Sequence, residues 1–311
     1  MADLKKFAVI GGGMMGSAIA QVLASIDGAS VIVRDIFDID IKAKVRGNMK
    51  LLVEHGVVTE QDVEDRVAKI EFTKDINDPR IADAELLIEG VLEDMKLKQD
   101  TFAELEKVCR PDCIFCTNTS VMSPTEIYSK IEHKERACGT HFWNPGYLIP
   151  LVEVVKTVNT SDEVINTVVE TLAKAGKKPV VCKKDVPGFI ANRMQHALWR
   201  EAISIVENGI ADAETVDIAV KNSFGLRLPQ LAPLENSDMV GTQLTYNIHN
   251  YVLNYIEDSH KPSPLLQQMI DEGKFGFRAE DGQGFYKWDE ESKKKANDDL
   301  STYLIRMLYG K

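Results

Sequence analysis

The sequence has few cysteines and no apolar stretch long enough to cross a bilayer. Five cysteines among 311 residues is an odd number and a low density, which favours a reduced cytoplasmic protein over a disulfide framework. No run reaches the ~18 apolar residues that a transmembrane helix needs. No apolar segment of signal-peptide type follows the basic start. We therefore expect a cytoplasmic protein that does not associate with membranes.

Positive charge is also scarce. The chain carries 37 Lys and Arg against 48 Asp and Glu, a net charge of −11. This balance argues against general binding to nucleic acid or to an anionic membrane surface. Hydrophobic residues at 44% and charged residues at 27% are typical of a globular enzyme or binding protein. A phosphate-bearing ligand would have to be held by backbone amides or by a few placed cations.

The hydrophobic pattern of the chain changes after the segment Asp185-Val186-Pro187-Gly188. Before it, β-prone and helical stretches alternate; after it, helical periodicity dominates. We predict an α/β fold, with a Rossmann-type dinucleotide-binding domain at residues 1–185 and a mostly α-helical domain at residues 186–311. Expected strands lie at 6–10, 29–33, 70–72, 86–89, 113–117, 137–142, 152–155 and 179–182, and expected helices of the second domain at 190–208, 213–223 and 239–256.

A glycine cluster follows the first expected strand. Gly11-Gly12-Gly13-Met14-Met15-Gly16 fits G-x-G-x-x-G, a helix follows it, and the next strand ends at Asp35. In this context the first glycine makes a tight turn, the second lets the backbone approach a pyrophosphate, and the third lets helix pack on strand. Asp35 would bind the ribose hydroxyls and repel a 2′-phosphate, which favours NAD over NADP. The residues that we assign to this cofactor site are Gly11, Gly13, Met14, Met15, Gly16 and Asp35.

Three cysteines have the C-x3-C-x2-C spacing of some iron–sulfur sites. They are Cys109, Cys113 and Cys116. The last two lie in or beside an expected strand, where positions three apart point to opposite faces and cannot converge on one cluster. We therefore interpret them as ordinary cysteines and predict no metal site.

A histidine and a glutamate mark the most informative pair of strands. His141 ends one expected strand, and Glu153 lies inside the next, in Pro-Leu-Val-Glu-Val-Val. A carboxylate within an apolar strand is costly unless it has a partner. A nearby histidine would be that partner, held in one tautomer and made more basic. The pattern predicts a His–Glu dyad at the carboxyl end of the sheet, where such folds place ligands.

With these residues in place, the chain resembles the 3-hydroxyacyl-CoA dehydrogenase family, including its 3-hydroxybutyryl-CoA members. The likeness extends over almost the whole length. The segments that carry it are the glycine loop, Asn118-Thr119-Ser120, His141-Phe142-Trp143-Asn144-Pro145, Leu151-Val152-Glu153-Val154, the run from Lys184 to Arg193, and Gly282-Gln283-Gly284-Phe285-Tyr286.

The resemblance implies an enzyme that oxidises an L-3-hydroxyacyl-CoA reversibly with NAD, and a role for each matching residue. His141 would be the general base, Glu153 would orient it, and Asn144 would lie beside them. Ser120 and Asn192 would bind the substrate. The remaining cofactor contacts implied are Asn118 and, at the nicotinamide half, Glu93 and Lys98. The family's helical second domain also implies a homodimer.

Some residues depart from the CoA-dependent pattern. Family members acting on CoA thioesters carry a serine and lysines on the helix after the second strand, where this chain has Asn48, Glu54 and His55. Trp143 and Tyr147-Leu148-Ile149-Pro150 are more similar to relatives acting on free 3-hydroxy acids or keto esters, such as carnitine, L-gulonate or diketo-ester reductases. Pro233-Leu234-Glu235 resembles that branch as much as the CoA branch. Two alternatives therefore remain beside the CoA reaction: a CoA-independent 3-hydroxy-acid dehydrogenase, and a non-catalytic NAD-binding protein.

Overall fold

Eight strands form one sheet in the computed structural model, which describes residues 3–311, in the order β3-β2-β1-β4-β5-β6-β7-β8. Neighbouring strands are parallel except β6 and β7, which pair antiparallel. The order reverses beside β1, so a crevice for ligands is expected at the carboxyl ends of β1 and β4. The strands are β1 (Lys6–Ile10), β2 (Ser30–Arg34), β3 (Ile70–Thr73), β4 (Leu86–Glu89), β5 (Ile114–Thr117), β6 (Ala137–Phe142), β7 (Leu151–Val155) and β8 (Lys178–Cys182).

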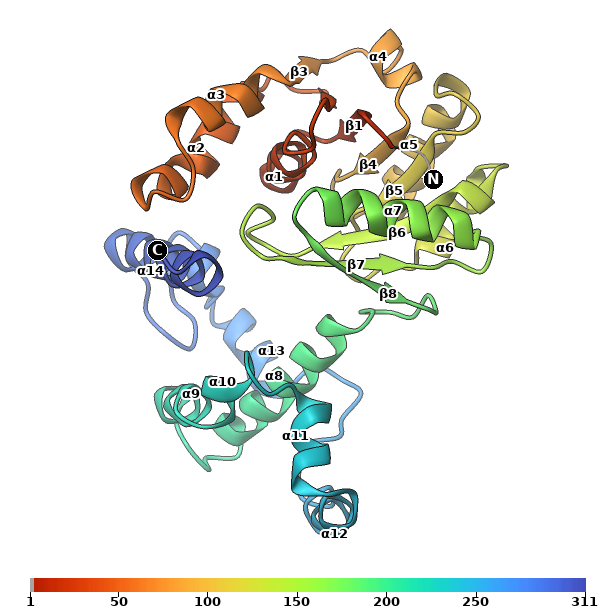
Figure 1. The fold of residues 1–311 in the computed structure, drawn as a ribbon. Coiled ribbons are helices and arrows are strands. Elements are labelled where there is room, and N and C mark those ends of the chain that lie inside the picture. Colours follow the sequence, from red (N-terminus) through yellow and green to blue (C-terminus); the bar gives the residue numbers. More distant parts are fainter. Residues whose placement is uncertain (1–2) are drawn as a thin grey trace. The chain divides into compact units, whose positions relative to one another are not determined.

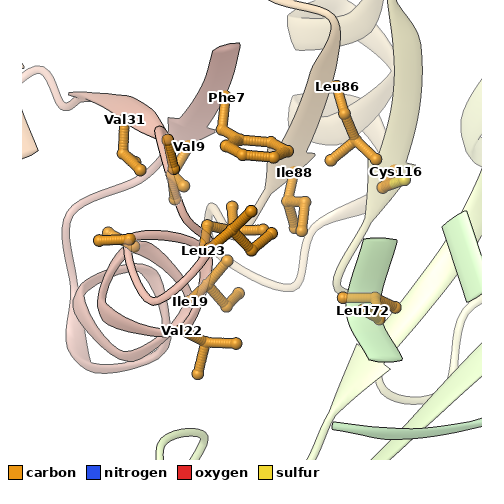
Figure 2. Packing of buried hydrophobic residues seen from close by; sticks show 14 of the residues in the cluster. Phe7, Val9, Ile19, Val22, Leu23, Val31, Leu86, Ile88, Cys116 and Leu172 are labelled. Atoms are coloured by element: carbon orange, nitrogen blue, oxygen red, sulfur yellow. The ribbon is translucent and has the colours of Figure 1, made fainter. Parts of the chain in front are cut away.

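Both faces of the sheet are covered by helices. Alternation along β1 sends Phe7 and Val9 into one apolar cluster and Ala8 and Ile10 into the other. Figure 2 shows the first cluster, where side chains of β1 meet those of the helix that follows it. Helices α1 (Met14–Leu23), α2 (Ile41–Glu54), α3 (Glu60–Ala68) and α7 (Asp162–Lys174) contribute to the first cluster, and α4 (Pro79–Ala82), α5 (Met95–Val108) and α6 (Pro124–Ile127) to the second.

Local sequence signals explain where these helices begin. Asp40 caps α2 by accepting a hydrogen bond from the backbone of Ala43, and Thr59 forms a capping box at the start of α3. In α2 the buried positions recur every three or four residues, which is the spacing of one helix face.

Short 3-10 helices cover Tyr128–Lys130, Lys134–Arg136 and Gly276–Arg278.

The chain divides into two compact units. The first contains the described residues up to Arg193 together with Asp298–Lys311, and the second contains Met194–Asn297. Residues 298–311, which the sequence places in the second domain, thus belong to the first unit, where Ile305 is fully buried in a cluster with Leu52 of α2 and Leu148. The helices after β8 are α8 (Ala191–Glu207), α9 (Ala213–Lys221), α10 (Phe224–Arg227), α11 (Pro233–Val240), α12 (Thr242–Val252), α13 (Pro264–Asp271) and α14 (Glu290–Tyr309) (Figure 1).

The expectation of one helical stretch over 239–256 is wrong. Gly241 has a φ of +97°, so α11 ends before it and α12 begins after it. A right-handed helix cannot continue through that conformation, which glycine adopts without strain. The α/β sheet followed by a helical region confirms the predicted fold class. None of the helices within residues 3–311 combines the length and apolarity needed to span a bilayer.

Candidate active site

The glycine loop joins the end of β1 to the start of α1. Gly11 has a φ of +99°, and a side chain there would come 2.7 Å from the carbonyl oxygen of Gly90. A Cβ on Gly16 would lie 1.7 Å from the oxygen of Gly11, so the loop and α1 touch directly. Gly13 is different: a Cβ there would meet no atom within 4 Å, and no side chain caps the helix. Space beside Gly13 and uncapped amides at a helix start fit a pyrophosphate.

Asp35 stands directly after β2, against this loop. Its Oδ2 accepts a hydrogen bond from the backbone N–H of Gly12 at 2.6 Å, and its Oδ1 accepts one from Phe37 at 3.0 Å. The carboxylate is therefore fixed at the edge of the loop, where it can receive ribose hydroxyls. Of the two methionines in the loop, Met14 is 62% exposed and Met15 is half-buried.

A buried carboxylate at the end of β4 organises the next part of the site. Glu89 is fully buried and accepts hydrogen bonds from Lys98 at 2.8 Å and from the hydroxyl of Thr117 at 2.7 Å. Burial raises the pKa of Glu89, and the Lys98 ammonium partly counters this. The same ammonium lies 3.2 Å from Glu93. Sequence reasoning missed Glu89, although an acidic residue ending an apolar strand is the signal that drew attention to Glu153.

Glu93 links this network to the loop after β5. Its Oε1 accepts hydrogen bonds from the hydroxyl of Thr119 and, at 3.0 Å, from the backbone N–H of Ser120. Burial works to raise the pKa of Glu93, but these donors and Lys98 outweigh it and lower the pKa below its usual value. Lys98 itself is only 1% exposed. Lys98 is therefore better placed to hold Glu93 than to contact a ligand.

The other predicted ligand contacts fall into two groups. Asn118 ties neighbouring strands, because its Oδ1 accepts a hydrogen bond from the backbone N–H of Phe142 at 2.9 Å. Asn192, near the start of α8, donates to the carbonyl oxygen of Ser120 at 2.9 Å, so these two expected substrate contacts lie together. Asn144 is exposed and precedes a cis peptide bond to Pro145. Within the described residues, no hydrogen bond joins Asn144 to His141 or Glu153.

His141 and Glu153 face each other across the antiparallel pair β6 and β7. The Nδ1 of His141 lies 2.8 Å from Oε2 of Glu153, and the two residues are 4% and 0% exposed. The other ring nitrogen, Nε2, makes no hydrogen bond within the described residues. A carboxylate on Nδ1 fixes the tautomer in which Nε2 is a proton acceptor. The pair can therefore act as a base directed through Nε2.

Glu153 is held by four donors. Its Oε1 accepts hydrogen bonds from the backbone N–H groups of Ile190 and Ala191, at 2.9 and 3.0 Å, where α8 begins. Its Oε2 accepts from His141 and, at 3.2 Å, from the indole Nε1 of Trp143. Burial works to raise the pKa of Glu153, but these donors outweigh it and lower the pKa, so the carboxylate stays ionised.

Two aromatic residues near the dyad were not predicted as site residues. Trp143 donates to Glu153, and its ring centroid lies 5.4 Å from that of His141. Phe189 is buried, and its ring centroid lies 5.8 Å from the imidazole. Its φ of +51° is unusual for a bulky side chain. Strain of this kind is retained where the surroundings fix it, which makes Phe189 part of the support of His141.

The cysteines lie on both faces of the sheet. Cys109 and Cys113 belong to one apolar cluster, and Cys116 and Cys138 belong to the other. Cys116 and Cys138 have their sulfurs 3.8 Å apart. Residues 3–311 contain no group of three or more His, Cys, Asp or Glu side chains that could hold a metal ion. Cys113 and Cys116, three positions apart, thus lie on opposite faces of the sheet, as strand alternation requires, and Cys109 ends α5.

A sheet with this order, a glycine loop at its switch point and a carboxylate after β2 belongs to the class of nucleotide-linked dehydrogenases. Comparison with known families is more specific. The NAD-binding domain of 3-hydroxyacyl-CoA dehydrogenase matches residues 6–186, and the C-terminal domain of the same enzyme matches residues 188–288. The chain is a member of the 3-hydroxyacyl-CoA dehydrogenase family, an NAD-dependent oxidoreductase of that type.

Relatives with different substrates match the chain. A probable 3-hydroxybutyryl-CoA dehydrogenase of Deinococcus radiodurans is 35% identical over 91% of this chain and 100% of its own length. A 5-formyl-3-hydroxy-2-methylpyridine 4-carboxylate 5-dehydrogenase of Mesorhizobium japonicum is 29% identical over 99% of both chains. A crystal structure of an enzyme with that pyridine activity, described as an NAD⁺-dependent dismutase, has a TM-score of 0.88, 28% identity and 99% coverage of both chains.

The structure of an Escherichia coli 3-hydroxybutyryl-CoA dehydrogenase is less similar in shape. It has a TM-score of 0.76 and 32% identity, and the match covers 92% of this chain and 60% of that one. The family domains end at residue 288, whereas α14 covers Glu290–Tyr309. A match over 99% of this chain must extend into α14, so the pyridine enzyme resembles this protein in a segment beyond the family domains.

Proposed function

We propose that the protein transfers a hydride between NAD and a hydroxyl-bearing carbon, with His141 as the general base. In the oxidative direction Nε2 of His141 takes the hydroxyl proton while NAD accepts the hydride from the same carbon. Glu153 keeps the imidazole in the required tautomer and stabilises it when it is protonated. The 2.8 Å contact between the two side chains is the observation that carries the proposal. Ser120 and Asn192, joined at 2.9 Å, would hold the substrate.

The cofactor would be held by the loop from Gly11 to Gly16 and by Asp35. The open space beside Gly13 and the uncapped start of α1 suit the pyrophosphate. Asp35 would bind the adenosine ribose, with Met14 and Met15 beside it. Glu93, held in place by Lys98 at 3.2 Å, would contact the nicotinamide half of the cofactor. Asn118 would contact the cofactor as well.

We propose further that the substrate is a small free acid and not a CoA thioester. The resemblance places CoA contacts on the helix after β2, which is α2. Here the end of α14 packs on that helix, with Ile305 buried against Leu52. Two of the four cations of α2 are also paired: Arg46 forms two hydrogen bonds with Glu64, at 2.7 and 2.8 Å, and Lys50 lies 3.8 Å from Glu54. Lys42 and Lys44 are then the two cations of α2 that remain for a polyphosphate, on a helix partly covered by α14.

Oxidation of NADH by the full-length protein tests the substrate class. The substrates are acetoacetate, acetoacetyl-CoA, other free 3-keto acids, and 5-formyl-3-hydroxy-2-methylpyridine 4-carboxylate, the last followed as NAD reduction. We expect at least one free acid to have a kcat/KM ~100-fold above that of acetoacetyl-CoA, a difference of ~2.7 kcal/mol in transition-state binding. Preference for the thioester would contradict this part of the proposal.

The CoA reaction is the second candidate. It is favoured by the 35% identity to the probable 3-hydroxybutyryl-CoA dehydrogenase, which this chain matches over that enzyme's full length. In that reaction His141 and Glu153 would have the same roles, so the same assay separates the two substrates without disturbing the dyad. If no compound of the panel reacts but NADH binds tightly, a non-catalytic NAD-binding protein would be the better account.

The indole of Trp143 is expected to tune the dyad. Trp143→Phe removes the donor to Glu153 while keeping an aromatic ring beside His141. Without this donor the Glu153 carboxylate stabilises the protonated imidazole more strongly. We therefore expect the acidic midpoint of the pH profile of kcat/KM to rise, with KM nearly unchanged. Trp199→Phe, in the second unit, is the control. An unchanged midpoint in Trp143→Phe would show that the indole only fills space.

We also propose that the protein is a homodimer formed through its second unit. Within residues 194–297, Val216 is the one apolar residue counted among the buried core. On α12, Leu244 is 53% exposed and Tyr251 is 70% exposed. Apolar surface of this extent is typical of a surface covered by another chain. Light scattering of the purified protein should give the mass of two chains, and the mass of one chain would contradict the dimer.

A further inference from the structure

A cavity of ≈ 570 Å³ lies within the first unit, and none of the residues assigned to NAD or to the reaction lines it. Its walls come from five segments that are distant in the sequence. They are the end of α1, the turn between α2 and α3 with Arg66, residues 147–150, the turn between α7 and β8, and the last turn of α14.

The charge of this cavity is opposite to that of the protein. Four cations line it and no carboxylate does, in a chain with 48 acidic and 37 basic residues. One of the four is neutralised, because Lys174 lies 2.8 Å from Asp3. The others are Arg66, Lys177 and Lys178.

Arg66 is a half-buried cation of this cavity. Burial lowers its pKa, and the charges that counter this are Asp62 on its own helix and the side chain of Tyr309. Within the described residues Arg66 forms no ion pair at hydrogen-bonding distance, and Asp62 acts on it only as a nearby charge. A guanidinium that has lost water without gaining a carboxylate gains most from a bound anion.

Lys177 faces the same cavity from the turn before β8. Its ammonium donates to the carbonyl oxygens of Gly146 at 2.5 Å and Ile149 at 2.8 Å, which leaves one of its three donors. Burial lowers the pKa of Lys177 to about 8. A negative charge beside this ammonium would favour its charged form.

A polar atom without a partner lies on the α1 side. Gln21 is 1% exposed, and its Oε1 has no hydrogen-bond partner. Buried amide oxygens are rarely left unsatisfied, so this acceptor indicates that something donates to it. Apolar residues complete the lining: Val22, Leu52, Val57, Val58, Leu148 and Leu308.

We propose that this cavity is a binding site for a small organic anion, separate from the NAD and substrate sites. The negatively charged head would lie between Arg66 and Lys177, and an apolar body would contact Leu52 and Leu148. A hydroxyl or amine on that body would donate to Gln21. Two cations and an apolar wall suit a phosphate monoester better than inorganic phosphate, because only the ester fills both parts of the cavity.

The test is calorimetric titration of the full-length protein at saturating NADH, so that the cofactor site is filled. The probes are phenyl phosphate, inorganic phosphate and 3′,5′-ADP, the last to tell a nucleotide from a simple ester. We expect one probe molecule per chain and tighter binding of an ester than of inorganic phosphate. Arg66→Gln should weaken ester binding at least about tenfold, or ~1.4 kcal/mol.

Two further variants distinguish a change in the cavity from a general loss of the folded protein. Lys44→Gln removes an exposed cation of α2 that does not line the cavity and should leave the dissociation constant unchanged. Leu308→Trp adds bulk at the cavity without changing its charge and should also weaken ester binding. Absence of binding of all three probes at millimolar concentration, or equal binding by the parent, Arg66→Gln and Leu308→Trp, would overturn the proposal. Turnover of the parent with its substrate is a separate measurement, so failure of the one does not imply failure of the other.

Discussion

His141→Gln is expected to lower kcat by about 10²–10⁴-fold, the range that a positioned general base contributes. Glutamine can still accept and donate hydrogen bonds, but it cannot take up the hydroxyl proton at neutral pH. The imidazole is 4% exposed and its partner carboxylate is fully buried, so bulk water is a poor substitute as a base. Steady-state NADH oxidation measures the effect.

The binding of NADH should change little in the same variant. Fluorescence titration of NADH gives its dissociation constant, which we expect to stay within about twofold of the parent. The hydrogen-bond partner of His141 in the described residues is Glu153, whereas Asp35 bonds to Gly12 and Phe37. His133→Gln, at an exposed histidine, is the matched control and should retain activity. Turnover of His141→Gln within a few-fold of the parent would remove His141 from the role of base.

Gly13→Ala is expected to abolish most NAD binding while leaving the fold intact. The added methyl would meet no protein atom within 4 Å, so the melting temperature should not change. The same methyl would occupy the space proposed for the pyrophosphate, and we expect the dissociation constant of NADH to rise at least about tenfold, or ~1.4 kcal/mol. Titration of NADH and thermal unfolding of the same sample measure both quantities.

Two other glycines make this prediction specific. A Cβ on Gly16 would lie 1.7 Å from the oxygen of Gly11, so Gly16→Ala should lower stability as well as NAD binding. Gly47, within α2, has open space around it, so Gly47→Ala should be neutral or slightly stabilising. Unaltered NADH affinity in Gly13→Ala would place the pyrophosphate elsewhere.

The sheet and the dyad could be predicted because each has a local signal. Short runs of β-branched residues predicted the strands, and the Glu153 carboxylate inside one of them predicted a buried partner. In the structure β6 and β7 pair antiparallel, and His141 lies opposite Glu153 with 2.8 Å between Nδ1 and Oε2. The glycine loop was recognisable because its spacing lies between a strand and a helix.

Other features depend on contacts between distant segments, which no local pattern shows. Trp143 reaches Glu153 only because the two strands pair in one register. Lys98 looked available on a charged helix start, yet Glu89 holds it in the interior. The return of residues 298–311 to the first unit rests on Ile305 meeting α2, a contact across about 250 residues of sequence that charge and periodicity do not reveal.

In the reductive direction, the reaction that we propose is hydride transfer from NADH to a keto carbon, with His141 supplying the proton. The test is incubation with NADH that carries deuterium at both C4 positions, together with a free 3-keto acid that is turned over, followed by mass spectrometry of the product. The account predicts one deuterium on the carbinol carbon of the hydroxy acid with the parent protein, and almost none with His141→Gln. Oxidation of NADH without deuterium in the hydroxy acid would contradict it.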